Sequence, residues 1–181
     1  MVDTRPLGRQ PGSSRTVSRA VSAPGSFATG MSGVPEGAEI DLDLRLEAVM
    51  EGVLVTGTAT ATATGECSRC LDPVSEPVEA GFQELFRYPS DDDLGPADPV
   101  DQDDEDEDYY LEGESIDLEQ VVRDAVVLAL PLSPLCRDDC PGLCVECGVK
   151  LADAEPGHGH GDGVDPRWEA LRQLGEEPGD R

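Results

Sequence analysis

Six cysteines in two groups constrain this chain more than any other feature of its sequence. The first two form a C-x-x-C pair and the other four follow one another closely: Cys67 and Cys70, then Cys136, Cys140, Cys144 and Cys147. A two-residue spacing allows a turn to point two sulfurs at one metal ion. Four thiolates in tetrahedral geometry are the usual ligands of structural zinc. The cysteines therefore predict a zinc-binding, irregular segment.

The N-terminal sequence favours metal binding over disulfides. Residues 1–20 are rich in Arg and Ser and contain no apolar core of a secretory signal. No apolar stretch of the sequence is long enough to cross a membrane. We therefore expect a cytoplasmic protein, in which thiols stay reduced and clustered cysteines more often bind a metal than form disulfides, remain free or act as a redox pair.

Two sets of ligands fit the spacing. In the first, the four later cysteines bind one zinc among themselves. In the second, Cys67 and Cys70 bind the zinc together with Cys144 and Cys147. The first is favoured because small loops close at little entropic cost. It leaves Cys67 and Cys70 as a pair whose thiolate form Arg69 favours, so that a redox or partner-contact role stays open.

Two histidines stand after the last cysteine. His158 and His160 lie in a Gly- and Asp-rich stretch, residues 157–163. This composition predicts a solvated loop, with additional metal ligation as the alternative.

Residues 40–86 are typical of an antiparallel sheet. Apolar and charged residues alternate strictly over residues 40–47, which predicts a strand with one buried face. Alternating Thr and Ala within residues 53–64 predict a second strand, whose thin alanine face needs a closely packed neighbour. Residues 74–86 form the expected return strand, and Pro73 and Pro77 restrict its start to an edge or an irregular position. The C-x-x-C pair then lies at the hairpin tip.

One helix is predicted with clear ends. Asp117 is a plausible N-cap with Gln120 three residues later, as in a capping box, and Pro131 ends the helix after Leu130. Its apolar face predicts that it packs across the sheet. A second, short helix is expected to begin at Asp165 and Pro166, with an apolar stripe that anchors the tail: Trp168, Leu171 and Leu174.

The overall prediction is an α+β fold, either an antiparallel meander or a partly closed barrel with one main packed helix. The expected segments are a partly ordered basic leader with an edge strand at residues 16–21 (1–33), the meander (34–88), a disordered acidic linker (89–110), the core helix (111–135), the cysteine-rich zinc-binding segment (136–151), and a loop with the short C-terminal helix (152–181).

The charge of the chain limits its partners. Its 13 basic residues face 39 acidic ones, a net charge of −26, which repels nucleic-acid phosphates and favours a basic protein partner. Direct nucleic-acid contact through the leader arginines, Arg5 to Arg19, is the less favoured alternative. The sequence has no G-x-S-x-G, P-loop or G-x-G-x-x-G motif and no nucleophile with an evident base. We therefore expect a protein that is not an enzyme.

Several motifs, taken in order, resemble the YceD-like family of large ribosomal RNA accumulation proteins, in its actinobacterial form. The resemblance covers about residues 5–174, and its most specific elements are C-S-R-C-L and C-P-G-L-C-V-E-C-G. The pieces that carry it are Val34–Gly37, Glu47–Val55, Gly65–Leu71, Arg123–Pro131, Cys140–Gly148 and Asp165–Trp168.

The resemblance implies a role in biogenesis of the large ribosomal subunit, and it favours two independent cysteine sites over one shared site. Together with the charge, it leads to the hypothesis of a zinc-stapled adaptor that binds a basic ribosomal protein or a pre-ribosomal particle. The alternative is a thiol-based redox or zinc-sensing regulator that uses Cys67 and Cys70.

Overall fold

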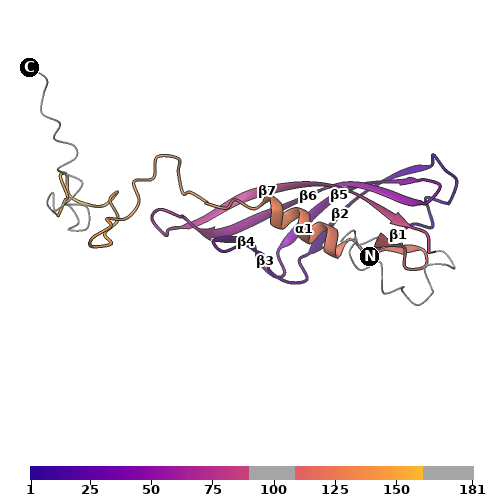
Figure 1. Ribbon diagram of the computed structural model, residues 1–181, viewed down its shortest axis with the longest axis horizontal. Helices are drawn as coiled ribbons and strands as arrows, with labels where there is room; N and C mark the ends of the chain where they lie inside the picture. Colours follow the sequence, from indigo (N-terminus) through magenta and orange to yellow (C-terminus); the bar gives the residue numbers. More distant parts are fainter. Residues whose placement is uncertain (90–108, 161–181) are drawn as a thin grey trace, which may run out of the picture.

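The computed structural model describes residues 1–89 and 109–160. Within these ranges, a long sheet carries a single helix on one face, and the cysteine-rich segment extends beyond one end of the sheet (Figure 1). This is the α+β architecture expected from the sequence. Most of the predicted acidic linker and the predicted C-terminal helix lie outside the described residues.

Three long antiparallel strands form the middle of the sheet: β5 (Glu39–Ala48), β6 (Gly52–Glu66) and β7 (Pro73–Arg87). The outer side of β5 pairs with β2 (Ser14–Ser22) along its whole length. Beyond the end of β5, the same edge of β6 pairs with β4 (Ser32–Val34), which in turn pairs with β3 (Phe27–Ala28). The sequence thus located the central hairpins to within two residues at each end.

The remaining strands are short. β8 (Tyr109–Tyr110) runs parallel to the end of β7, a pairing that the sequence did not indicate. β1 (Val2–Asp3) and β9 (Ser115–Ile116) form a separate two-stranded ladder. Among the described strands, the main sheet does not close on itself, so the meander and not the barrel is the form found.

The two faces of the sheet differ as the alternation predicted. Four apolar residues of β5 are buried on the inner face: Ile40, Leu42, Leu44 and Leu46. On β6 the small residues Ala59, Ala61 and Ala63 are buried on the same side, whereas the threonines lie on the open side. The helix α1 (Glu119–Ala129) crosses the inner face and contacts β7, β3 and β6. The thin alanine face therefore receives a closely packed helix.

The helix begins one residue later than the capping box requires. Leu118 takes the N-cap position, and the Asp117 carboxylate accepts a hydrogen bond from the Glu119 N–H at 3.0 Å. Gln120 is then only the second helical residue, and its amide donates forward to Asp124 at 2.9 Å. The expected reciprocal contact of a capping box does not form because Gln120 is one position too early.

The leader is bound to the body of the protein. β2 confirms and extends the edge strand expected at residues 16–21. Arg5 forms an ion pair with Asp3 at 2.8 Å, the Arg9 guanidinium lies 5.0 Å from the centre of the Tyr88 ring, and Arg19 donates to the Met1 carbonyl. These three arginines therefore already make contacts within the fold.

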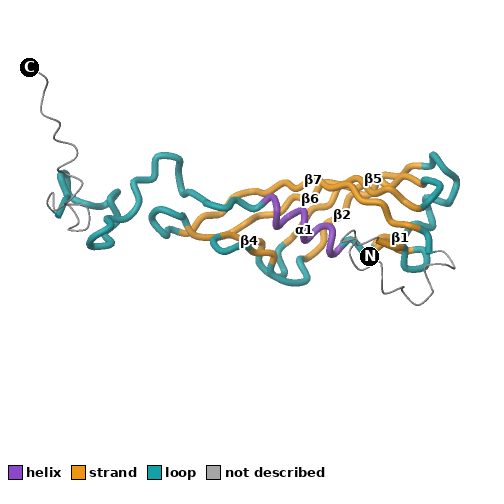
Figure 2. Tube along the Cα trace, viewed as in Figure 1, coloured by secondary structure: helices purple, strands orange, loops and turns teal. Residues whose placement is uncertain are grey.

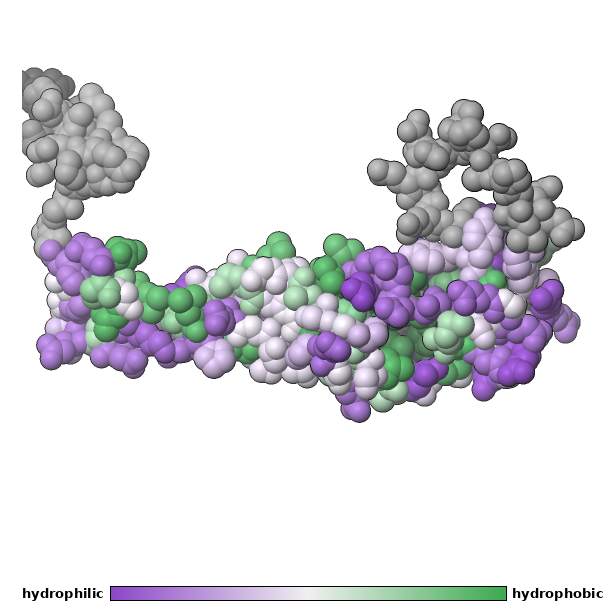
Figure 3. All heavy atoms as spheres, turned by 90° about the horizontal axis from the view of Figure 1, so that it is seen from below, coloured by the Kyte–Doolittle hydropathy of each residue, from purple (hydrophilic) through white to green (hydrophobic). Residues whose placement is uncertain are grey.

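The segment after α1 is irregular. Figure 2 shows it as loop that runs from the helix to the cysteine-rich end. The exposed face of the molecule seen in Figure 3 carries apolar patches separated by hydrophilic surface, including at this end. No helix in the described ranges is long and apolar enough to cross a membrane.

Candidate metal centre

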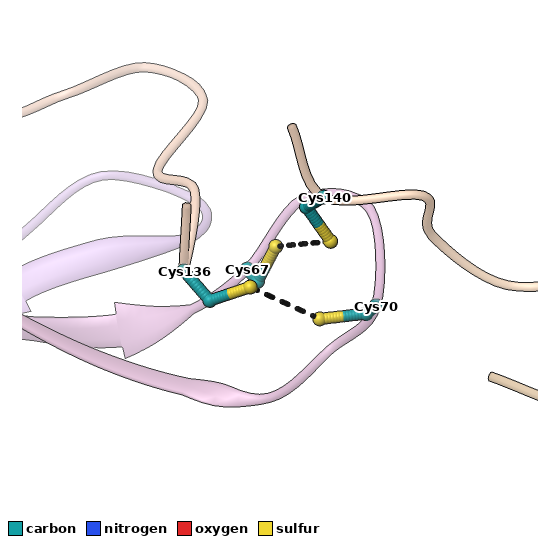
Figure 4. Close-up of side chains that lie close together, drawn as sticks. All are labelled: Cys67, Cys70, Cys136 and Cys140. Atoms are coloured by element: carbon teal, nitrogen blue, oxygen red, sulfur yellow. Dashed lines mark hydrogen bonds between the residues drawn. The ribbon is translucent and has the colours of Figure 1, made fainter. Parts of the chain in front are cut away.

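Four sulfurs converge at the tip of the β6–β7 hairpin. Cys67 and Cys70 belong to the hairpin loop, and Cys136 and Cys140 come from the segment after α1 (Figure 4). The Sγ atoms of Cys67 and Cys140 are 3.8 Å apart, those of Cys70 and Cys136 are 3.6 Å apart, and all four lie within 4.8 Å of one another.

These separations match a metal site and not disulfides. A tetrahedral zinc ion with Zn–S bonds of about 2.3 Å places its sulfurs about 3.8 Å apart. A disulfide would require about 2.05 Å. All six cysteines are free thiols in the structure. The four residues therefore fit the ligand set of one zinc ion.

A tight turn points the first two sulfurs in the same direction. The Cys67 N–H donates to the Asp72 carbonyl at 2.7 Å, and the Leu71 N–H donates to the Cys67 carbonyl at 2.9 Å. Leu71 has a φ of 61°, the only positive φ of a non-glycine residue in the described ranges. Such a backbone costs free energy and persists where its surroundings impose it. Here the two hydrogen bonds and the β6–β7 pairing impose it.

Backbone contacts dock the later segment on this turn. The Ser68 N–H donates to the Pro134 carbonyl at 2.8 Å. The Arg69 guanidinium donates to the carbonyls of Cys140 at 3.0 Å and Asp138 at 3.3 Å. The expected influence of Arg69 on a free thiol pair is therefore replaced by a role in holding the segment that brings Cys140 to the site.

Backbone donors and burial act in opposite directions on the thiols of this cluster. The Cys136 N–H, which donates to the Cys67 sulfur, lowers the pKa of Cys67 to about 6 despite the opposing effect of burial. The Asp72 N–H favours the Cys70 thiolate, but burial and the neighbouring thiols raise the pKa of Cys70 to about 12. Without a metal the cluster therefore does not hold four thiolates at neutral pH. A divalent ion would compensate their charge.

The ligand grouping differs from both sequence-based sets. The structure divides the four later cysteines between two places, so they do not form the favoured local site. Cys67 and Cys70 do share a group with later cysteines, as in the ribbon alternative, but with Cys136 and Cys140 in place of Cys144 and Cys147. The reason is that Ser68 and Arg69 satisfy carbonyls of residues 134–140, which brings the nearer pair of cysteines to the hairpin tip.

The remaining cysteines lie with the two histidines. Cys144, Cys147, His158 and His160 place their ligand atoms within 4.8 Å of one another. The histidines were expected in a solvated loop. The available signal was an H-x-H pair that begins eleven residues after the last cysteine of a C-x-x-C pair, and this signal is weak because the intervening composition is that of a loop.

Two further residues, which the sequence did not single out, join the two groups. The Lys150 ammonium group forms an ion pair with the Asp72 carboxylate. This contact lowers the pKa of Asp72 and raises the pKa of Lys150. The Leu143 N–H also donates to the Arg69 carbonyl at 3.1 Å. The second group is thus held against the hairpin tip.

Comparison with known proteins identifies the family. The profile of the family described as "Large ribosomal RNA subunit accumulation protein YceD" matches residues 55–175. The chain belongs to the YceD family. Within the described residues, the match includes most of β6, the whole of β7, α1 and both ligand groups.

The chain is also similar in sequence to proteins of mycobacteria and to a YceD family protein of a plant. An uncharacterized protein of Mycobacterium tuberculosis is 48% identical over 173 residues, which cover 96% of this chain and 80% of that protein. An uncharacterized protein of Mycobacterium leprae is 42% identical over 172 residues, 95% of this chain and 76% of that protein. The maize "Large ribosomal RNA subunit accumulation protein YCED homolog 1, chloroplastic" is 26% identical over 129 residues, 60% of this chain and 41% of that protein. No solved structure matches significantly.

The two ligand groups of this YceD family member have the composition and spacing that a metal ion requires. Tetrahedral groups of four sulfurs, or of two sulfurs and two nitrogens, are typical ligand sets of zinc. A group of four sulfurs is also typical of iron–sulfur centres. Four protein ligands leave no open position for a substrate, which is the arrangement of a structural zinc site.

Proposed function

We propose that this YceD family protein is a non-enzymatic factor in biogenesis of the large ribosomal subunit. In this proposal it acts as an acidic adaptor that binds a basic ribosomal protein or a pre-ribosomal particle. The description of the family, and the name of the maize relative, refer to accumulation of the large ribosomal subunit RNA. The adaptor role is argued from charge.

The observation that carries the proposal is the excess of acid, with 39 acidic residues against 13 basic ones. Part of it lies on the open face of the sheet, where the strand register aligns Asp41 with Thr60 and Thr60 with Glu79. Asp43 lies on the same face. Arg45, the basic residue of this part of β5, is paired with Glu47 at 2.8 Å. The face therefore favours a cationic partner.

The same charge argues against a broad grip on RNA. Proteins that bind nucleic acid neutralise phosphates with Lys and Arg. The chain has one lysine, and Arg5, Arg9 and Arg19 of the leader already contact Asp3, the Tyr88 ring and the Met1 carbonyl. A basic protein is therefore the better-supported partner.

Zinc has a structural role in this proposal. The four-cysteine group joins the tip of the β6–β7 hairpin to the segment after α1, which are separated by more than sixty residues of sequence. Metal binding to such a site contributes directly to the free energy of folding. The ion would hold the end of the sheet in the form that a partner recognises.

The alternative, a thiol-based redox or zinc-sensing regulator, receives less support. It requires accessible thiolates. Cys67 is 0% exposed and Cys70 is 5% exposed, and both lie within the four-sulfur group.

Binding measurements with the purified full chain test the proposal. Basic large-subunit ribosomal proteins and bare large-subunit RNA are titrated separately over a range of salt concentrations. The triple variant Asp41→Asn, Asp43→Asn and Glu79→Gln should bind the ribosomal protein about tenfold more weakly, given several tenths of a kcal/mol per exposed charge. The matched variant Glu36→Gln, Glu112→Gln and Asp139→Asn changes the net charge equally elsewhere and should bind nearly as the wild type does. Tight, salt-insensitive binding to bare RNA, with none to basic ribosomal proteins, would contradict the proposal.

A further inference from the structure

We propose that Cys144, Cys147, His158 and His160 bind a second zinc ion, at a site that exchanges its metal more readily than the four-cysteine centre. This inference rests on the geometry of the four side chains and is independent of the proposed role in ribosome biogenesis.

The ligand atoms are spaced as a mixed tetrahedral site requires. The Nε2 atoms of His158 and His160 are 3.2 Å apart, and they lie 3.5 Å and 3.1 Å from the Sγ atom of Cys147. Zinc bonds of about 2.05 Å to nitrogen and 2.3 Å to sulfur give about 3.3 Å between two nitrogens and about 3.6 Å between nitrogen and sulfur. Both histidines thus present the same ring nitrogen toward one point.

The second C-x-x-C turn repeats the backbone of the first. The Cys144 N–H donates to the Val149 carbonyl at 2.8 Å, and the Gly148 N–H donates to the Cys144 carbonyl at 2.9 Å. The same two hydrogen bonds, at the same relative positions, form the turn of Cys67 and Cys70. Gly148 has a φ of 72° where the first turn has Leu71, and glycine adopts this backbone without steric cost. The two turns are therefore the same structural unit.

The likeness includes the donors around the first sulfur of each turn. The backbone N–H groups of Cys147 and Glu146 donate to the Cys144 sulfur. The N–H groups at the equivalent positions of the first turn donate to the Cys67 sulfur. N–H groups directed at a sulfur stabilise the thiolate, which is the form that binds a metal. This support comes from the backbone alone and does not depend on sequence identity between the turns.

An outer contact orients one histidine. The Nδ1 atom of His160 lies 3.8 Å from a carboxylate oxygen of Glu146, and Nε2 faces the group. Histidines that bind a metal through one nitrogen commonly direct the other toward a carboxylate or carbonyl, which fixes the ring and its tautomer.

Protons alone do not satisfy the group. Cys147, His158 and His160 approach one another in three mutual contacts. A neutral imidazole has a single N–H, and a thiol has a single, weakly donating S–H. If His160 places its proton on Nδ1 toward Glu146, its Nε2 is an acceptor only. A cation at the centre would accept one lone pair from each of the four ligand atoms at once, including the Cys144 sulfur.

The exposure of the ligands predicts faster exchange. Cys144 is half-buried and Cys147 is exposed, whereas three ligands of the first site are buried. The His160 side chain is 32% exposed. A chelator therefore has more access to the second ion than to the first, where Cys136 is the one exposed ligand.

The test uses the whole chain and does not depend on its function. Zinc per chain is measured by elemental analysis for the wild type and for the double variant His158→Ala and His160→Ala. The matched control is Glu155→Gln, in the same loop, which offers no metal ligand to either group. We expect two zinc ions in the wild type and in the control, and one in the double variant.

Two further measurements identify which ion is lost. Release of zinc to an excess of chelator should show a fast and a slow phase of equal amplitude in the wild type, and only the slow phase in the double variant. In the cobalt-substituted protein, the double variant should keep the absorption bands of a four-sulfur site and lose those of a mixed sulfur–nitrogen site.

The outcomes separate the two sites. A zinc content that the double variant retains in full overturns the second site. One zinc in the wild type and none in the double variant would support the second site and contradict the four-cysteine centre. Unchanged thermal unfolding of the sheet in the double variant shows that the loss of metal is local.

Discussion

The carboxylate of Asp72 and the ammonium group of Lys150 form an ion pair that joins the two C-x-x-C turns. Asp72 ends the first turn, and Lys150, the only lysine of the chain, follows the second turn. Both side chains are about two-fifths exposed, at 41% and 43%. The pair therefore contributes to the relative position of the two turns more than to overall stability.

Removing this ion pair should loosen the second site. In Lys150→Met we expect the fast phase of zinc release to accelerate several-fold, because one tie between the turns is lost. The free energy of unfolding should fall by no more than about 1 kcal/mol, as is usual for a partly exposed pair. Stopped-flow release to a chelator and urea unfolding measure the two effects. Lys150→Arg keeps the charge and should resemble the wild type, and an unchanged release rate in Lys150→Met would count against the role of the pair.

The backbone of the two turns predicts a reciprocal effect on stability. Leu71 has a positive φ, which glycine adopts freely, so Leu71→Gly should stabilise the protein or leave it unchanged, by up to about 1 kcal/mol. Gly148→Leu forces a residue with a side chain into the positive φ of the equivalent position and should destabilise the second turn by a similar amount. The cost should not be larger, because no atom lies within 4 Å of the new Cβ. Urea unfolding measures the effect of Leu71→Gly, and the zinc affinity of the second site measures the effect of Gly148→Leu. Equal destabilisation by both substitutions would show that the turns are not equivalent.

Gly57 is required by close packing between strands. A Cβ at this position would lie 2.6 Å from the Phe82 ring and 2.7 Å from a methyl group of Leu44. Gly57→Ala should therefore destabilise the protein by about 1–3 kcal/mol, the usual cost of overpacking. Gly81→Ala on the neighbouring strand is the control, because its Cβ would meet no atom within 4 Å. Equal unfolding midpoints in urea for the two variants would contradict the packing described for the inner face.

Removal of metal should release the end of the molecule and spare the sheet. After chelation, we expect the amide of Ser68, which donates to the Pro134 carbonyl, and that of Leu143, which donates to the Arg69 carbonyl, to lose protection from hydrogen exchange. Amides in the pairing of β5 with β6 should keep theirs, because hydrophobic burial holds that region. Loss of protection throughout the sheet would show that the metal supports the whole fold.

The sequence predicted the parts of the structure that depend on local patterns. The alternation over residues 40–47 corresponds to a strand buried on one side, and Pro77 pairs with Thr62 on a stretch of β7 that has no second described partner strand, as its missing N–H requires. The hairpin tip was also predicted. The predicted start of the helix was one residue too early. Leu118, not Asp117, takes the N-cap position, and the Asp117 carboxylate accepts a hydrogen bond from the Glu119 N–H from outside the helix.

The grouping of the ligands depends on contacts between distant segments and could not be read from spacing. Loop closure favours Cys136, Cys140, Cys144 and Cys147 as one site. The hydrogen bond between Ser68 and Pro134, however, brings only the nearer two to the hairpin tip. Nothing local in the sequence reports that contact. The histidines were missed for a related reason, since the loop that carries them has the composition of solvated chain.

The zinc content of Cys67→Ser, compared with that of Cys144→Ser, tests the arrangement of the metal sites most directly. Cys67 lies 3.8 Å from Cys140 in sulfur–sulfur distance, and Cys144 belongs to the other group. Elemental analysis should find two zinc ions per wild-type chain and one in each single variant. It should find none in the variant that combines Cys67→Ser with Cys144→Ser. Full zinc content in Cys67→Ser, with loss in Cys144→Ser, would place the metal in a local site of the later cysteines and contradict the shared centre at the hairpin tip.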